Sequence, residues 1–185
     1  MWKKLLILYM AIVVPVYSIC LLLLISGEVT LFYSGFAVDS EGILYIGTDT
    51  KIEKYNKNEY VGEIPVKARN YAFTIQENDT IMLSTALTVY ILDSDGNVID
   101  KYEDAGTQVF NQLQYNKNNF ITQSGVEYKL ISELGRSRII SDDGFIIYEM
   151  PYLSYIIKIA LFISIISIFV FVPIIIYKSK NIHKK

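Results

Sequence analysis

The sequence predicts an all-β extracytoplasmic domain flanked by two transmembrane α-helices. The 185-residue chain is 52% hydrophobic yet 19% charged, and these two properties are separated along the sequence. Two apolar segments lie near the ends, whereas all 19 acidic side chains lie between Glu28 and Glu149. The acidic stretch consists of short β-branched and aromatic runs separated by polar turn clusters, a pattern typical of antiparallel β-structure.

The first apolar segment is the N-terminal region, residues 1–27. Residues 5–25 carry no charge, and at about 1.5 Å per residue a helix of this length crosses a hydrocarbon core of about 30 Å. A cleavable signal peptide also begins with basic residues such as Lys3 and Lys4, but its apolar run usually extends only about 7 to 15 residues. Ile19 stands directly before Cys20, where a lipoprotein would have a small residue. We therefore expect an uncleaved signal anchor.

The second apolar segment, residues 156–177, is interrupted only by Lys158. Lys158 lies in the first turn, where its long side chain can extend to the membrane interface. A charge that lines a transport pathway is the alternative, and it would need a polar partner. Pro15 and Pro173 lie inside the two spans, where each removes one helix hydrogen bond and can bend the helix. We expect such bends to serve helix packing.

Basic residues flank the two spans on one side of the membrane. Lys3 and Lys4 precede the first span, and the tail, residues 178–185, contains four lysines. Short basic flanks stay in the cytoplasm. The pattern predicts a plasma-membrane protein with both termini cytoplasmic and residues 28–155 outside. The many Ile, Lys and Asn residues indicate an AT-rich bacterial genome.

The central segment restricts the possible chemistry. It carries ten basic and nineteen acidic side chains, a net charge of about −9, which disfavours nucleic acid and anionic lipid as partners. It contains no Cys and no His, because Cys20 lies in the first span and His183 in the tail. A disulfide framework, a Cys or His metal site and a Ser-His-Asp triad are therefore excluded there. We expect no catalytic residue, no metal site and no cofactor; an enzyme that uses carboxylates alone is the alternative.

Strands and turns alternate through the central segment, and no stretch of it has a helical period. The predicted strands are Gly42–Gly47, Thr80–Ser84, Thr88–Leu92, Asn97–Tyr102, Phe120–Thr122 and Ser137–Ile140. The predicted turns are Asp39–Gly42, Glu77–Asp79, Asp93–Asn97 and Asp142–Gly144.

These elements form three similar copies. Residues 36–64, 73–102 and 113–140 align with one another, beginning at Phe36, Phe73 and Leu113. Each copy contains four short strands in about 40 residues, the content of one blade of a β-propeller.

The first copy resembles a known family. The segment from Ala37 to Tyr55 is similar to an NHL-type β-propeller repeat, with its Asp-rich turn, Gly42, an aromatic strand, and a basic-apolar strand that ends in an aromatic residue. The resemblance implies propeller-like antiparallel blades. Propellers typically have four to eight blades, and only three fit here. The domain is therefore an incomplete propeller, or a second copy of the chain completes it to six blades. An open three-sheet stack and a β-sandwich are the alternatives.

Two side-chain groups have a second interpretation. Asp93, Asp95 and Asn97 could hold calcium, but an EF-hand loop needs Gly at its sixth position and Gly96 stands at the fourth. We expect a hairpin turn there, and also at Asp142–Gly144. The Asn78–Thr80 glycosylation motif is expected to be unused in a bacterium.

The tyrosines of the central segment could form a binding surface for glycans or peptides. Tyr55, Tyr90 and Tyr128 fall at repeat-equivalent positions, so we expect them to pack between strands. Tyr152 and Tyr155 precede the second span and are expected in the aromatic belt of the membrane interface.

The predicted function is a binding or scaffold module that presents the β domain to a protein partner or to a second copy of the chain. A signal-sensing accessory subunit of a larger membrane complex is the alternative.

Overall fold

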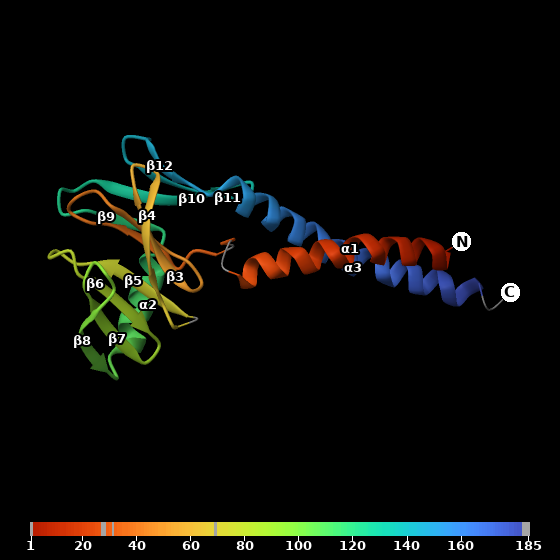
Figure 1. Ribbon diagram of the computed structural model, residues 1–185, viewed down its shortest axis with the longest axis horizontal. Helices are drawn as coiled ribbons and strands as arrows, with labels where there is room; N and C mark the ends of the chain where they lie inside the picture. The colour runs from red at the N-terminus through yellow and green to blue at the C-terminus, as the bar shows by residue number, and fades with distance from the viewer. Residues whose placement is uncertain (1, 27–28, 31, 69, 183–185) are drawn as a thin grey trace. The chain divides into compact units, whose positions relative to one another are not determined.

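The computed structural model describes residues 2–26, 29–30, 32–68 and 70–182 (Figure 1). The chain forms two compact units, Met1–Leu31 with Pro151–Lys185, and Phe32–Met150. The predicted boundary at residues 27–28 and the end of the basic tail, with His183, lie outside the described residues.

The first unit is a pair of long helices, α1 (Trp2–Ile25) and α3 (Tyr152–Ile182). Both are long and apolar enough to cross a membrane, over Ile7–Ile25 and Tyr152–Ile174. α3 begins earlier than the predicted span because Pro151 precedes it and the Tyr155 amide donates to the Pro151 carbonyl, 3.1 Å away. Pro15 and Pro173 lie inside helices that continue past them.

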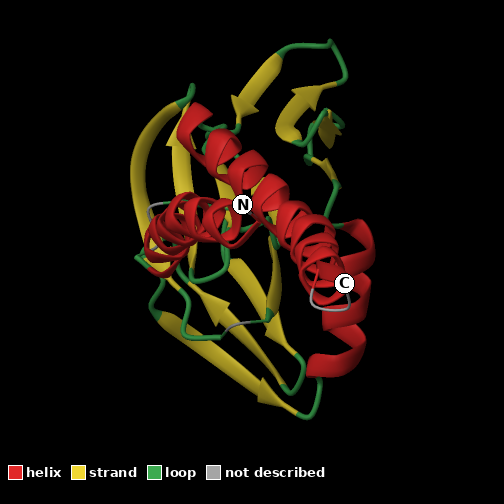
Figure 2. Ribbon diagram, turned by 90° about the vertical axis from the view of Figure 1, so that its right-hand side faces the viewer, coloured by secondary structure: helices red, strands yellow, loops and turns green. Residues whose placement is uncertain are grey.

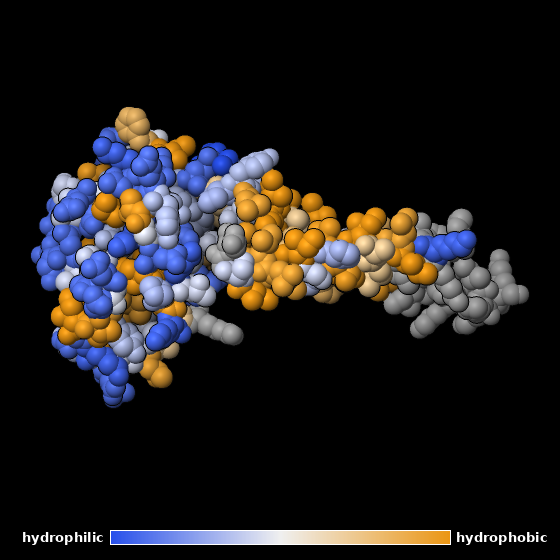
Figure 3. Space-filling view, in the orientation of Figure 1, coloured by the Kyte–Doolittle hydropathy of each residue, from blue (hydrophilic) through white to orange (hydrophobic). Residues whose placement is uncertain are grey.

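The two helices pack against each other in antiparallel directions. Near the end of α1, Cys20 lies in a buried cluster with Ile157 and Leu161 of α3. Near its start, the Tyr9 hydroxyl lies 2.7 Å from Ser167 Oγ. Ser167 donates its own proton to the Ser164 carbonyl, so Tyr9 is the donor. Most of the apolar side chains along both helices face outward (Figure 3).

The second unit is mostly β-structure, as predicted. Among the described residues, twelve strands (yellow in Figure 2) form three four-stranded antiparallel sheets, each a simple meander. The first sheet contains β1 (Gly35–Val38), β2 (Leu44–Gly47), β3 (Lys51–Asn56) and β4 (Glu59–Pro65). The second contains β5 (Tyr71–Ile75), β6 (Ile81–Thr85), β7 (Thr88–Leu92) and β8 (Val98–Glu103). The third contains β9 (Asn119–Ile121), β10 (Glu127–Glu133), β11 (Arg136–Ser141) and β12 (Ile146–Glu149). Every predicted strand segment overlaps one of these strands.

The first sheet is the middle layer of this unit. Its alternate side chains enter two different cores, because successive residues of a strand face opposite sides. Ala37 and Ile52 pack against the second sheet, in a core with Phe73 and Leu83. Phe36, on the other face, packs against the third sheet. This double burial explains why β1 and β2 are buried at every position.

A helix that the sequence analysis did not predict follows the second sheet. α2 (Gly106–Asn116) packs on the face of that sheet that points away from the first sheet. Leu83 faces the first sheet, and its neighbour Ser84 donates from the opposite face to the Gly106 carbonyl, 3.0 Å away. α2 therefore covers a sheet face that would lie against the next blade in a propeller.

The third repeat was misplaced because of this helix. Leu113, the predicted start of the third copy, lies in α2, and the third sheet runs from Asn119 to Glu149 instead of from 113 to 140. Phe120 is the aromatic residue on the first strand of that sheet.

Five hairpins in the described residues share one turn geometry. In each, the amide of a first residue donates to the carbonyl four positions later, and the amide three positions later donates back to the first residue's carbonyl. The fourth residue has positive φ, as expected for a type I turn followed by a bulge. The first residues are Asp39, Gln76, Asp93, Thr122 and Ser141, and the fourth residues are Gly42, Asp79, Gly96, Gly125 and Gly144. The four predicted turns are all among these hairpins.

The Asp93 carboxylate closes its own turn, as predicted. Its Oδ1 accepts from the amides of Asp95 and Asn97, at 2.9 and 2.8 Å, and its Oδ2 accepts from the Asn97 side chain at 2.8 Å. The hydrogen bonds from Asn97 hold the pKa of Asp93 below its ordinary value.

Candidate functional site

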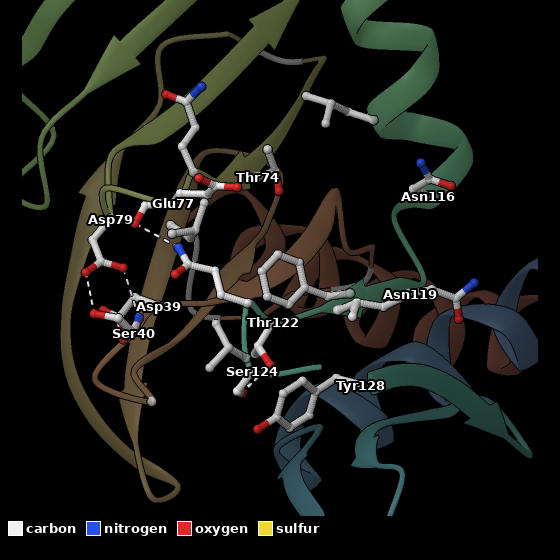
Figure 4. A pocket seen from close by; sticks show the side chains of 18 residues that line it. Asp39, Ser40, Thr74, Glu77, Asp79, Asn116, Asn119, Thr122, Ser124 and Tyr128 are labelled. Atoms are coloured by element: carbon white, nitrogen blue, oxygen red, sulfur yellow. Dashed lines mark hydrogen bonds between the residues drawn. The ribbon is translucent and has the colours of Figure 1, made fainter. Parts of the chain in front are cut away.

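A cavity of about 1000 Å³ lies at the ends of the three first strands, β1, β5 and β9 (Figure 4). Each of these strands runs into the shared turn described above, so three equivalent turns meet at the rim. The C-terminal end of α2 and the start of β9 close another side. The lining residues are Val38, Asp39, Ser40, Gly42, Thr74, Ile75, Gln76, Glu77, Asp79, Leu113, Asn116, Asn119, Phe120, Ile121, Thr122, Gln123, Ser124 and Tyr128.

Two hydrogen-bonded contacts join the turns to one another. Asp79 of the second sheet accepts from the backbone amide of Ser40 at 2.9 Å and also from the Ser40 hydroxyl. Gln123 of the third sheet donates its side-chain amide to the Glu77 carbonyl at 2.7 Å. The rim is therefore a connected structure that belongs to all three sheets, although no two of these turns are adjacent in sequence.

Two of the three carboxylates in the lining are occupied by structural contacts. Asp39 Oδ1 accepts from the amides of Glu41 and Ile43, and its Oδ2 accepts from the Tyr45 hydroxyl at 3.2 Å. Burial, and then the charge of Asp39, raise the pKa of Tyr45. Asp79 is bonded to Ser40. Glu77 differs, because its carboxylate has no hydrogen-bond partner within the described part of the chain.

The opposite side of the cavity carries neutral polar groups. Asn116 at the end of α2 and Asn119 on β9 lie across the cavity from Asp39, Ser40 and Asp79 (Figure 4). Neither Asn side chain makes a hydrogen bond to another described residue. No Lys, Arg or His is among the described lining residues.

Two half-buried aromatic side chains, Phe120 and Tyr128, also line the cavity. Phe120 packs against both cores of the β unit and contacts the Phe36 ring at a centroid distance of 6.4 Å. Tyr128 packs against the core shared with the third sheet. Its hydroxyl makes no hydrogen bond to the described residues, whereas the hydroxyl of Tyr45 is bonded to Asp39 and that of Tyr71 donates to the Lys51 carbonyl at 2.7 Å.

The structure corrects the predicted equivalence of three tyrosines. Tyr55 and Tyr90 lie on the third strands of their sheets, β3 and β7, but Tyr128 lies on the second strand, β10. Tyr128 corresponds to Tyr45, because each lies six positions after the first residue of its hairpin turn, Thr122 or Asp39. The misplaced third repeat caused this error.

Tyr55 packs between strands as expected, in a cluster with Tyr33 and Tyr148. Its ring lies 5.2 Å from that of Tyr148, and the hydroxyls of Tyr33 and Tyr148 are 3.2 Å apart. Burial raises the pKa of Tyr33 to about 12, and it raises the pKa of Tyr148 as well. These tyrosines are structural and do not line the cavity.

Several rim residues are recognisable in the sequence only as turn residues. Asp39, Asp79 and their neighbours were recognised by turn chemistry, which is local. Tyr128 was named only among the tyrosines that could form a binding surface, and the lining residues Asn116, Asn119 and Gln123 carried no local signal, because the proximity of these residues depends on how three sheets and an unpredicted helix pack together.

Comparison with known proteins places few limits on the function. No protein-family model matches the chain, and no curated protein matches it. Among solved structures, it is similar to a streptogramin B lyase (12% identity, TM-score 0.35, covering 66% of this chain and 42% of that one). It is also similar to virginiamycin B lyase from Staphylococcus aureus with quinupristin (8% identity, TM-score 0.34, covering 63% of this chain and 40% of that one). A protein of unknown function from Bacteroides caccae is similar as well (12% identity, TM-score 0.33, covering 63% of this chain and 44% of that one). The chain spans about two fifths of the length of these structures.

Proposed function

We propose that this chain is a membrane-anchored binding module that takes up a ligand in the cavity between its three sheets. The observation that carries the proposal is the composition of the cavity: several polar groups without partners and two fixed aromatic rings face a space within the usual range for small-molecule sites. The Ser40 hydroxyl donates to Asp79, but the Asp79 carboxylate also holds the backbone amide of Ser40, and the central segment has no His that could act as a base beside this pair, which favours binding over catalysis.

A binding screen on the full-length protein in lipid nanodiscs tests this function. We would compare the chain with its Asn119→Trp variant, which places a bulky indole at the cavity, against a library of sugars, amines and short peptides by ligand-observed NMR. Compounds that bind the original chain and lose binding in the variant support the proposal. If every compound binds the original chain and the Asn119→Trp variant equally, the proposal is contradicted. A matched Asn111→Trp variant on α2, outside the cavity lining, controls for non-specific effects of the added ring.

The proposal includes a membrane topology. α1 and α3 span the plasma membrane with both termini in the cytoplasm, and the β unit lies outside. The antiparallel packing of the helices supports this arrangement, as do Lys3, Lys4 and the four lysines of the tail, residues 178–185. In a Cys20→Ala background, a membrane-impermeant maleimide applied to intact cells should label Ser94→Cys and leave Lys180→Cys unlabelled. The reverse labelling would contradict the topology.

We also propose that the β unit is an NHL-type propeller-like domain and that it binds a protein partner or a second copy of the chain. The third sheet supports it, because the hairpin that joins β11 and β12 exposes Phe145 and Ile146 at 72 and 48%. A second copy that covers this surface would bring the number of sheets to six. The molar mass of the full-length protein in mild detergent, corrected for bound detergent, tests it: a dimer that Phe145→Lys dissociates supports completion by a second copy, and a monomer at all concentrations contradicts it.

A further inference from the structure

We infer that the ligand of the cavity is a neutral, hydroxyl-rich molecule, a short oligosaccharide. This inference rests on the proposed function and specifies the class of ligand.

The charge of the lining argues against anionic ligands. No basic side chain is among the described lining residues, and Glu77 contributes a carboxylate without a partner. The central segment has a net charge of about −9. A phosphate, sulfate or carboxylate would lose its hydration shell and gain no counter-charge, so its binding would be unfavourable.

The remaining polar groups argue against a simple cation. A cation requires acceptors, yet two of the three carboxylates already accept hydrogen bonds within the rim, from Ser40 and from the turn of Asp39. The groups that stay available are of mixed kind. Asn116 and Asn119 each offer two donors and an acceptor, and the Tyr128 hydroxyl offers one donor and accepts as well. Sugar hydroxyls also both donate and accept, and therefore match this set.

The aromatic side chains provide the second element of sugar recognition. A pyranose ring has an apolar face of C–H groups, which packs favourably on an aromatic surface. The rings of Phe120 and Tyr128 are held on one side by the cores of the β unit, so little side-chain entropy is lost when a ligand packs on their other side.

The size of the cavity indicates more than one sugar unit. A volume of about 1000 Å³ lies at the upper end of the range for small-molecule sites. A monosaccharide would leave most of it to water, whereas a chain of two or three units would reach both the carboxamide side, with Asn116 and Asn119, and the Glu77 side.

The test is isothermal titration calorimetry of the full-length chain in nanodiscs with three probes: N,N′,N″-triacetylchitotriose, maltotriose and trilysine. We expect at least one trisaccharide to bind and trilysine not to bind. Asn116→Ala should weaken trisaccharide binding about fivefold, since one hydrogen bond contributes about 1 kcal/mol. Tyr128→Phe should weaken trisaccharide binding less than Asn116→Ala does, because the aromatic ring that packs on the sugar is retained. Asn111→Ala, on α2 but outside the lining, should leave affinity unchanged.

The outcomes separate this inference from the proposed function. If trilysine binds and Glu77→Gln or Asn119→Trp abolishes its binding, the sugar inference is overturned and the binding function stands. If neither trisaccharide binds while the screen finds a cavity ligand of another class, the sugar inference is likewise overturned and the binding function stands. If trisaccharides bind equally well to the Asn116→Ala and Asn119→Trp variants, they bind elsewhere and the inference fails. If no compound in either experiment depends on the cavity variants, both proposals fail.

Discussion

Asp79 in the turn between β5 and β6 binds Ser40 in the turn between β1 and β2, accepting from both its backbone amide and its hydroxyl. Asp79 also stands at the fourth position of its turn, where the other four hairpins of this geometry have Gly, and it adopts a φ of 58°. A residue with a Cβ is disfavoured in this conformation by about 1 kcal/mol. The contact with Ser40 offsets that cost and fixes two sheets at the rim of the cavity.

Two substitutions of Asp79 distinguish the cost of its positive φ from the stabilisation by its hydrogen bonds with Ser40. Asp79→Ala removes both hydrogen bonds and keeps a Cβ at positive φ, so we expect a loss of about 1 to 2 kcal/mol in the free energy of unfolding. Asp79→Gly removes the same bonds but relieves the strain, and should lose about 1 kcal/mol less than the Ala variant. Denaturant unfolding of the β unit, followed by circular dichroism in detergent, measures both. Equal losses in the two variants would show that no strain is present.

A second prediction concerns Gly106 at the start of α2. A Cβ there would lie 2.4 Å from the backbone of Leu87 and Thr88, which cannot move as a side chain can. Gly106→Ala should therefore lower the free energy of unfolding by about 1 to 3 kcal/mol and displace α2 from the second sheet.

The matched control for this substitution is Gln108→Ala, at an exposed position of the same helix. It should change stability by less than about 0.5 kcal/mol, because it removes no described contact. Similar effects of the two substitutions would contradict the close approach of α2 to the sheet.

The parts of the fold that were predictable are those encoded by local chemistry. Gly42, Gly96 and Gly144 permit the positive φ of their turns, and Asp39 and Asp93 close their turns with side-chain hydrogen bonds. These signals lie within five residues of sequence, so the hairpins and their strands could be located without knowledge of the tertiary structure.

α2 could not be predicted in the same way. Its N-cap residue, Ala105, has no side-chain hydrogen bond to the helix, and its first turn has no acidic residue. Its apolar side chains, Val109, Phe110 and Leu113, are interspersed with Gln and Asn, and they become a half-buried face only because the second sheet lies beneath them. The cavity was missed for a related reason, since contacts such as that of Gln123 with Glu77 join residues 46 positions apart.

A third prediction concerns Glu149 on β12, which joins two arginines of β11. Its Oε1 lies 2.6 Å from Arg138 Nε and its Oε2 lies 3.0 Å from Arg136 Nη2, with all three side chains about one third exposed. Glu149→Gln should lower the free energy of unfolding by about 1 to 2 kcal/mol, because charge-assisted pairs at partly buried sites exceed ordinary surface pairs. The control is Glu127→Gln, which loses a more exposed pair with Lys129 at 3.3 Å and should cost at most about 0.5 kcal/mol. Equal losses in both variants would contradict a special role for Glu149.

The last prediction is a loss of stability at alkaline pH, to which the cluster of Tyr33, Tyr55 and Tyr148 contributes, as do the buried phenols of Tyr45 and Tyr71. Burial raises the pKa of Tyr33 to about 12, whereas a tyrosine in the unfolded chain has a pKa of about 10. Above about pH 10 the unfolded chain releases phenolic protons that the folded chain retains, so the free energy of unfolding falls as pH rises from about 10 to about 12. Below about pH 10 the contribution of these groups is fully present. The measurement is the denaturation midpoint across this range together with tyrosinate absorbance. Tyr148→Phe removes one buried phenol and should make the decline shallower, and a midpoint that stays constant to about pH 12 would contradict the burial of the cluster.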